Sequence, residues 1–366
     1  MSPCLEMDLA VVRARYLELR IALPEARVFY AVKANPEPDV LRTLAEAGSG
    51  FDVASIGEIT LVLELGADPG SLCHANPVRT PEETASAFAA GVHLFVTDSA
   101  EDLDVLALHA PGASVLVRLA VDDSGSATPF GGKFGCSEDE AAVLLPRAAA
   151  LGLDVAGLSF HVGSQQSDPK AWSGAIAACA RVASSSGVEL RLLDLGGGFP
   201  VRYREPVASL SECASAISDA LALAFPARRP ELAVEPGRVL VAEAGVLHAR
   251  VVRVSRRHDG RRWVYLDVGR YGGLAETEGE AIRYRLRTPH DDGPLEPSVL
   301  AGPTCDGDDV LYREVPLPTA LRAGDPVRLL AAGAYTASYA SIAFNGLPPL
   351  PVHCTDSAHP VPTPRT

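Results

Sequence analysis

Short apolar runs recur along the first two thirds of the chain, and each ends in polar or glycine-rich residues. Runs of this kind are typical of buried strands. Alanine-rich stretches with apolar residues at helical spacing separate them, and a glycine closes each, as in "PDVLRTLAEAG" and "TPEETASAFAAG". The runs are "RVFYAVK" (27–33), "GFDVAS" (50–55), "SLCHANP" (71–77), "HLFVTDS" (93–99), "SVLVRLAV" (114–121), "VAGLSFHVGS" (155–164), "LRLLDLGGG" (190–198) and "ELAVEPGR" (231–238).

Strand and helix therefore alternate eight times, which is the pattern of a closed, parallel (β/α)8 TIM barrel. An open, doubly wound sheet also alternates strands with helices and is the second candidate. Eight regular units within about 240 residues favour closure. We expect an α/β protein whose TIM barrel spans residues 8–240.

After Arg238 the pattern changes to valine-rich segments in which apolar and polar residues alternate, such as "RVLVAEAGVLHARVVRVSRR" and "RWVYLDVG". Alternation of this kind is typical of antiparallel strands with one exposed face. We expect a mainly antiparallel β-sandwich or barrel domain over residues 241–366, to which residues 1–7 could add an edge strand. The closing segment "CTDSAHPVPTPRT" is expected to be a loose tail.

Composition and charge exclude several classes of protein. With 366 residues, 47% of them hydrophobic, the chain can bury a large core. The formal net charge is −14, with acids and bases mixed along the chain, so nucleic acid is not an expected partner. The sequence contains neither a signal peptide nor an apolar run long enough to span a bilayer, so we expect a cytoplasmic protein without a membrane partner.

The cysteines are scattered, with no C-x-x-C pair and no clustering with histidine. This spacing favours neither a disulfide framework nor a metal site, and it suits a reducing cytoplasm. They are Cys4, Cys73, Cys136, Cys179, Cys213, Cys305 and Cys354.

Polar residues of several kinds occupy the ends of the predicted barrel strands. In a parallel barrel these ends meet at one mouth, where the chemistry takes place. A mouth with a purely structural role would not need so many different polar groups. They are Lys33, Asp52, Asn76, Asp98, Arg118, His161, the glycines Gly196, Gly197 and Gly198, and Glu235 followed by Arg238.

Lys33 ends its apolar run in "VFYAVKANP". A lysine at such a position is often an ordinary side chain whose ammonium reaches solvent. An apolar, partly desolvated setting would instead lower the pKa of the amine, as a lysine that forms a Schiff base requires. The other strand ends decide between these interpretations.

The glycines of "DLGGGFP" would let backbone N–H groups approach an anion closely. A glycine run alone is more often a plain tight turn. Ser164 in "HVGS" and Arg238 in "EPGR" could add hydrogen bonds to the same anion, which favours a phosphate site.

Glu235 and His161 point to the rest of a cofactor. A buried carboxylate needs a cationic partner, and a protonated pyridine nitrogen would supply one. His161 could stack on an aromatic ring, although a histidine satisfied within the core is also common. An amine for an aldehyde, a carboxylate for a pyridinium, a ring for stacking and glycines for a phosphate together describe pyridoxal 5′-phosphate (PLP).

The chain resembles the fold-type III PLP-dependent decarboxylases, most closely the bacterial ornithine decarboxylases. The matching motifs run in family order across nearly the whole chain. The resemblance implies an alanine-racemase-like barrel followed by a β-sandwich-like domain, in a homodimer with shared active sites. The motifs are "FYAVKANP", "FDVAS", "SFHVGSQ", "DLGGGFPVRY", "VEPGR", "YGGLAETEGEAIRY", "GPTCDGDD" and "GAYTASYASIAFNG".

The resemblance also implies roles for individual residues. Lys33 would hold PLP as a Schiff base, His161 would stack on the cofactor ring, and Glu235 would pair with the pyridine nitrogen. Arg118 and Asp52 would support the ring and the lysine. The phosphate would be bound by Ser164, Gly196, Gly197, Gly198, Arg238 and Tyr335.

By the same resemblance, Cys305 and Asp306 of "GPTCDG" would reach the active site of the partner subunit. Cys305 would donate a proton to the substrate Cα, although a free cysteine is usually a small buried hydrophobe. Asp306 would contact the distal amine of the substrate. Glu280 would supply a second carboxylate, and Tyr271 and Phe344 would line the substrate site.

We therefore expect an enzyme of polyamine biosynthesis that decarboxylates a basic amino acid, L-ornithine first, to putrescine and carbon dioxide. Lysine is an alternative, because one methylene changes binding free energy little. The same chemistry on arginine, a D-amino acid or a carrier-tethered amino acid is a further alternative. A catalytically silent regulatory homologue is the third interpretation. Such relatives typically lose the lysine, the phosphate contacts or the cysteine, all of which are present here.

Overall fold

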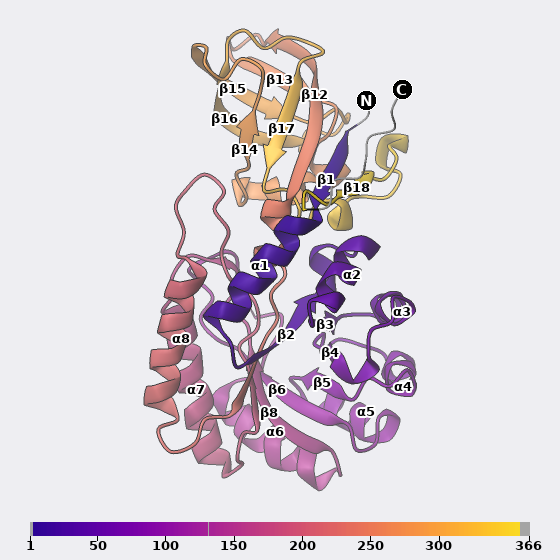
Figure 1. Cartoon of the computed structure of the whole chain (residues 1–366), viewed down its shortest axis with the longest axis vertical. Coiled ribbons are helices and arrows are strands. Elements are labelled where there is room, and N and C mark those ends of the chain that lie inside the picture. The colour runs from indigo at the N-terminus through magenta and orange to yellow at the C-terminus, as the bar shows by residue number, and fades with distance from the viewer. Residues whose placement is uncertain (1–2, 131, 359–366) are drawn as a thin grey trace. The chain divides into compact units, whose positions relative to one another are not determined.

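The computed structural model describes residues 3–130 and 132–358 (Figure 1). The chain divides into two compact units. The barrel unit contains residues 13–200 and 207–237. The sheet unit contains the described residues up to 12, residues 201–206, and the described residues from 238 onward.

The barrel unit is built on a closed barrel of eight strands, which confirms the predicted TIM barrel and excludes the open doubly wound sheet. Neighbouring strands in the closed order β10-β11-β2-β3-β4-β5-β6-β8 pair in parallel. The strands are β2 (Ala26–Ala31), β3 (Gly50–Val53), β4 (Leu72–His74), β5 (Leu94–Thr97), β6 (Ser114–Leu119), β8 (Asp154–Phe160), β10 (Leu192–Asp194) and β11 (Glu231–Val234).

Helices surround these strands, as Figure 1 shows. Several start at a capping box, in which a Ser or Thr side chain and a Glu three residues later bond each other's backbone N–H; Thr80 and Glu83 form one, and Ser137 and Glu140 another. No helix in the described part of the chain is sufficiently long and apolar to traverse a bilayer. The helices are α1 (Leu9–Ala22), α2 (Pro38–Glu46), α3 (Ile56–Glu64), α4 (Pro81–Ala89), α5 (Ala100–His109), α6 (Glu138–Ala150), α7 (Ala171–Ser186) and α8 (Leu210–Ala224).

A buried apolar cluster joins seven of the barrel strands and excludes water from the barrel interior. Because side chains alternate along a strand, each of these seven strands can contribute a residue to the cluster and still present polar groups at its end. Its buried members are Phe29, Cys73, Ala75, Val96, Leu116, Ala156, Leu192 and Ala233.

Two further strands lie outside the barrel. They are β7 (Ser126–Thr128), in the segment after β6, and β9 (Ser164–Gln166), in the segment after β8. They pair antiparallel, with Ser126 opposite Gln166 and Thr128 opposite Ser164. The pairing ties together two of the segments that leave the carboxyl ends of the barrel strands.

The sheet unit contains one eight-stranded sheet, mainly antiparallel as predicted. One pair on its main path, β13 with β15, is parallel and departs from the expected pattern. Its strands are β1 (Cys4–Asp8), β12 (Gly245–Arg256), β13 (Arg262–Leu266), β14 (Arg285–Arg287), β15 (Leu295–Ala301), β16 (Val310–Pro318), β17 (Pro326–Leu330) and β18 (Val352–Thr355).

The first and last strands of the described chain pair with each other in this sheet. β1 pairs antiparallel with β12 and parallel with β18, so it is not the edge strand that the sequence predicted (Figure 1). The loose tail expected from Cys354 onward is also wrong at its start, because Cys354 and Thr355 belong to β18. Residues 359–366 lie outside the described part of the chain.

Short helical segments carry several of the predicted site residues. Three of them contain a non-helical residue with positive φ, at Gly273, Gly279 and Asn345. The segments are η1 (Val32–Ala34), α9 (Arg238–Val241), η4 (Arg270–Leu274), η5 (Ala275–Glu280) and η7 (Phe344–Gly346).

Candidate active site

Lys33 lies just beyond β2, in the short η1 segment rather than in the strand itself. Its Nζ donates to Oδ2 of Asp52 at 2.5 Å. Asp52, on β3, is buried, whereas 48% of the Lys33 side chain is exposed. A carboxylate so close favours the charged amine. The Lys33 side chain is therefore about half exposed and ion-paired, rather than in a purely apolar setting.

Glu235 follows β11 directly and lies beside Asp194, the last residue of β10. One carboxylate oxygen of each, together with Sγ of Cys73, lies within 4.8 Å of the others. Burial raises the pKa of Asp194 to about 6, and burial followed by the nearby Asp194 raises the pKa of Glu235 well above its usual range.

These acids leave buried oxygens unsatisfied. Asp194 Oδ2, Glu235 Oε1 and Asp52 Oδ1 have no hydrogen-bond partner among the residues that the structure describes. Orphaned polar atoms in a buried site mark a place where a proton or a ligand is expected. The sequence pointed to Glu235 but missed Asp194, although Asp194 also ends a barrel strand.

His161 follows β8, and its Nδ1 accepts a hydrogen bond from the N–H of Gly163 at 3.0 Å. Burial, Arg118 and Lys33 together lower the pKa of His161 well below its usual range. The ring is therefore neutral at pH 7 and suited to stacking on another aromatic system. Phe130 meets it edge-on, with the ring centroids 4.7 Å apart.

Arg118, near the end of β6, packs against aromatic rings from the segment that follows that strand. Its guanidinium carbon lies 6.0 Å from the ring centroid of Phe130 and 5.0 Å from that of Phe134. Contacts at this distance are cation–π interactions. The sequence missed Phe130, since an aromatic residue in a glycine-rich segment carries no signal of its contact with His161.

The three glycines after β10 pack tightly against neighbouring backbone. A Cβ on Gly196 would lie 2.3 Å from the carbonyl oxygen of Phe160, and one on Gly197 would lie 2.5 Å from that of Glu235. No side chain fits at these positions. The N–H of Gly196 donates to Asp194 at 2.9 Å. This N–H, one of those predicted to bind an anion, therefore already has a partner.

Asn76 and Asp98, two further strand-end residues, accept hydrogen bonds from backbone N–H groups of loops. Asn76 Oδ1 accepts from the N–H of Val78, and Asp98 accepts from the N–H of Gly135 at 2.8 Å. These bonds give both side chains a structural role.

In the sheet unit, Arg238 and Tyr335 lie together, as their shared predicted role requires. Arg238 is 4% exposed, and its guanidinium carbon lies 4.9 Å from the ring centroid of Tyr335. Tyr335 has a φ of 53°, a left-handed conformation that is costly for a residue other than glycine. Arg238 also contacts Tyr203 and Glu276, which the sequence analysis did not single out.

Cys305, Asp306, Tyr271 and Phe344 form a second group in the sheet unit. The rings of Tyr271 and Phe344 stack with centroids 4.3 Å apart. Desolvation, followed by the charge of Asp306 and a hydrogen bond to it, raises the pKa of Tyr271. Cys305 is exposed, and its Sγ accepts from Nδ2 of Asn345 at 3.2 Å.

Glu280 has partners other than those predicted. Its carboxylate accepts from the guanidinium of Arg283 and from the N–H of Arg313. Burial opposes ionisation of Glu280, but these two hydrogen bonds outweigh it and lower the pKa. Glu280 itself has a φ of 59°, so the backbone is strained to direct this side chain.

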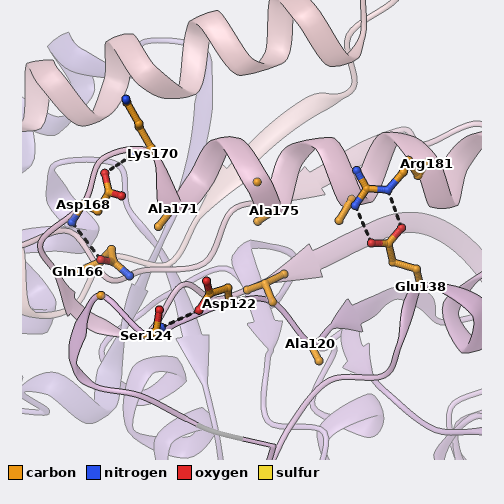
Figure 2. A pocket seen from close by; sticks show the side chains of 14 residues that line it. Ala120, Asp122, Ser124, Glu138, Gln166, Asp168, Lys170, Ala171, Ala175 and Arg181 are labelled. Atoms are coloured by element: carbon orange, nitrogen blue, oxygen red, sulfur yellow. Dashed lines mark hydrogen bonds and ion pairs between the residues drawn. The ribbon is translucent and has the colours of Figure 1, made fainter.

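A separate cavity of about 450 Å³ lies beside α7 in the barrel unit (Figure 2). None of the predicted site residues lines it. Its polar side chains bond mostly to one another or to nearby backbone: Arg181 pairs with Glu138, and the N–H of Asp168 donates to Gln166 (Figure 2). The cavity therefore shows no converging set of unsatisfied groups.

A family model described as pyridoxal-dependent decarboxylase, pyridoxal binding domain, matches residues 9–242. The chain belongs to the pyridoxal-dependent decarboxylases. As a member of this family it is an enzyme, an amino-acid decarboxylase that uses PLP.

Among its relatives is a lysine/ornithine decarboxylase of Selenomonas ruminantium, 37% identical over 350 residues, which are 94% of this chain and 87% of the relative. Antizyme inhibitor 2 of Xenopus laevis is 36% identical over 364 residues, covering 94% of this chain and 79% of that protein. The arginine decarboxylase of Paramecium bursaria Chlorella virus, solved with bound agmatine, matches with a TM-score of 0.89 at 30% identity and covers 97% and 96% of the two chains.

The residues present fit the cofactor of the pyridoxal-dependent decarboxylases. Glu235 offers an unsatisfied buried oxygen to a ring nitrogen. The glycines after β10 keep their positions clear of side chains, and Lys33 offers an amine at the barrel mouth. The barrel unit thus contains a site that suits a pyridine ring and an aldehyde.

Proposed function

We propose that this enzyme decarboxylates a basic amino acid, L-ornithine first, to putrescine and carbon dioxide. The observation that carries the proposal is the carboxylate of Asp306, which directly follows Cys305 with its exposed thiol and helps to raise the pKa of Tyr271. A second ammonium on the substrate needs such a carboxylate. The relatives named for ornithine, lysine or arginine decarboxylation support a basic substrate.

The barrel residues would prepare the reaction. PLP, when bound, supplies an electron-poor ring that accepts the electron pair left behind as carbon dioxide departs. Lys33 would hold the cofactor through its amine until the substrate amine replaces it, and Asp52 keeps that amine in place. Glu235 would hold a proton at the ring nitrogen, and the neutral ring of His161 would cover one face.

A residue of the sheet unit would supply the proton that the substrate Cα needs after carbon dioxide has left. A thiol beside a carboxylate is competent as a general acid, and Cys305 is exposed with its sulfur bonded to Asn345. Cys305 would give its proton to the substrate Cα after decarboxylation. Asp306 would bind the distal ammonium and fix the distance from it to Cα, with Glu280 as the second carboxylate of the pocket.

We also propose a cytoplasmic homodimer with shared active sites. The family resemblance implies that Cys305 and Asp306 act in the site of the partner subunit. All seven cysteines are free thiols in this fold, which suits a reducing compartment. Light scattering on the eluting protein tests the dimer, and a monomeric mass at working concentration would contradict it.

A substrate panel tests the proposed reaction. PLP-loaded protein is incubated with L- and D-ornithine, lysine, arginine and diaminopimelate, and carbon dioxide and amine are measured. We expect the highest kcat/KM with L-ornithine. A higher value with lysine, arginine or a D-amino acid would move the assignment to that substrate. No carbon dioxide from any of them would contradict the proposal and leave a carrier-tethered amino acid or a regulatory role.

A further inference from the structure

We propose that Glu276 is the counter-ion of Arg238 in the cofactor-free protein, and that the phosphate of an incoming cofactor replaces Glu276 as the charge partner of Arg238. The inference rests on the proposed role of Arg238 in binding the phosphate of PLP. It assigns a positioning role to a residue that the reaction itself does not need.

The contact between the two side chains is bidentate. Arg238 Nη2 donates to Glu276 Oε1 at 2.5 Å, and Nη1 donates to Oε2 at 2.8 Å. Their side chains are 4% and 10% exposed. A parallel pair of charge-assisted bonds fixes the plane of a guanidinium more firmly than one bond does.

Aromatic rings complete the surroundings of the guanidinium. Nη1 donates to the hydroxyl of Tyr203 at 2.8 Å, and the rings of Tyr203 and Tyr335 lie 5.9 Å and 4.9 Å from the guanidinium carbon. Burial alone would lower the pKa of Arg238, but Tyr203 and Glu276 raise it well above its usual range. Arg238 is therefore a permanent cation in a largely dry setting.

A permanent cation in such a setting is costly without a partner of opposite charge. Glu276 provides that partner before phosphate arrives, and it belongs to the same unit of the chain as Arg238. A phosphate that binds Arg238 then meets a guanidinium already neutralised and already oriented. On binding, Arg238 exchanges one anionic partner for another instead of gaining its first. The free energy of binding is then smaller, which favours reversible loading of the cofactor.

Replacing Glu276 by glutamine removes the charge and keeps the shape. In E276Q, Arg238 would depend on phosphate for its charge partner. The protein stripped of PLP should therefore lose stability, whereas the loaded protein should keep most of it. The gap in Tm between loaded and stripped protein should widen by at least about 5 °C.

The experiment compares full-length wild type, E276Q, E276D and E278Q, each loaded with PLP and then stripped of it. E276D retains a carboxylate and should keep a gap close to that of wild type. Glu278 is the matched control, because it is 80% exposed and pairs with Arg270 at the surface, so E278Q should leave the gap unchanged. Loading with pyridoxal, which lacks the phosphate, should abolish the extra widening in E276Q.

Loss of the cofactor gives a second readout that needs no substrate. On dialysis, the visible absorbance of PLP should decay from E276Q at least about tenfold more slowly than from wild type, since one repulsive charge near the phosphate is gone. An unchanged gap and an unchanged decay in E276Q would overturn the inference, as would equal widening with pyridoxal. If stripped E276Q does not fold, the E276Q/R238Q double variant should fold, because it buries no unpaired charge.

These outcomes are separate from the proposed reaction. Tm and cofactor retention are measured without an amino acid, so absence of decarboxylation would contradict the proposed function and leave the exchange of partners standing. Conversely, an active enzyme whose E276Q variant behaves as wild type in both readouts would retain its function and lose this inference.

Discussion

Asp194 and Glu235 lie at the ends of two adjacent parallel strands of the barrel, with a carboxylate oxygen of one within 4.8 Å of an oxygen of the other. Asp194 Oδ2 and Glu235 Oε1 are buried and have no hydrogen-bond partner in the described chain. Two carboxylates in this arrangement cannot both ionise without a large cost. At least one proton is therefore held within the pair while no ring nitrogen is present.

The proton on Asp194 makes stability depend on pH. Burial raises the pKa of Asp194 to about 6, so the folded protein keeps a proton that the unfolded chain releases between about pH 4 and pH 6. Stability of the PLP-stripped protein should fall as pH rises through that window. D194N cannot release the proton, so it should be more stable than wild type by up to roughly 3 kcal/mol at pH 8 and equal to it at pH 4.

Urea unfolding of the stripped protein at pH 4 to 8 checks this prediction. D219N, at an exposed position on α8, serves as the control and should follow wild type. Parallel stability curves for D194N and wild type over the whole range would show that Asp194 ionises as an ordinary carboxylate.

Lys33 should be essential for cofactor attachment. K33A removes the amine that would hold PLP, so the visible absorbance of the bound cofactor should disappear and kcat should fall at least about a thousandfold. K170A, which changes an exposed lysine at the cavity of Figure 2, should leave both unchanged. Persistence of the visible band in dialysed K33A would assign the attachment to another residue.

Gly197 should not accept a side chain. The Cβ of G197A would lie 2.5 Å from the carbonyl oxygen of Glu235 and 3.1 Å from Nε2 of His161, so the ends of β8 and β11 must move apart. We expect a loss of about 1–3 kcal/mol in unfolding free energy and weaker retention of PLP. G174A is the matched change, because a Cβ at Gly174 meets nothing within 4 Å, and it should be neutral by both measures.

Cys305 should act in the protonation step. C305A should lower kcat about 10²- to 10⁴-fold while binding of PLP, followed by absorbance, stays intact. C354A, on β18, is the control and should retain wild-type kcat. Undiminished turnover of C305A with amine as the sole product would remove the thiol from the mechanism.

Asp306 should govern affinity for the distal ammonium. D306N removes the charge with little change in shape, so KM for L-ornithine should rise about 10- to 100-fold, with a smaller effect on kcat. D308N changes an exposed neighbour and should leave KM as it is. A D306N variant with wild-type KM and reduced kcat would give Asp306 a role in the chemical step instead.

The barrel and the polar mouth were predictable because both follow local rules. Each strand is a short apolar run, and in a parallel barrel the residue after it lies at the mouth, so Lys33, Asp52 and Glu235 could be named from their positions alone. Asp194 could have been named by the same rule. Asp194 lies close to Glu235 because β10 and β11 are paired neighbours and both residues lie at the ends of these strands.

Contacts made by irregular segments were not predictable in this way. Glu276 contacts Arg238 from a short 3-10 segment, and the Arg283 guanidinium donates a hydrogen bond to the Glu280 carboxylate across one strained turn. Positive φ values at Glu280 and Tyr335 depend on the packing of the sheet unit and leave no periodic trace in the sequence. Phe130 likewise meets His161 from a loop.

The place of β1 between β12 and β18 has a consequence for synthesis of the chain. Among the described strands β1 leaves the ribosome before the others, yet its partners are residues 245–248 and 352–355, so it must wait with both hydrogen-bonding edges open. The barrel can close after β11 is made, whereas the sheet that includes β1 depends on very distant contacts and forms late. A nascent or truncated chain that lacks β18 would expose one edge of β1 to neighbouring chains. Pairing with β18 covers this edge and so prevents aggregation through it.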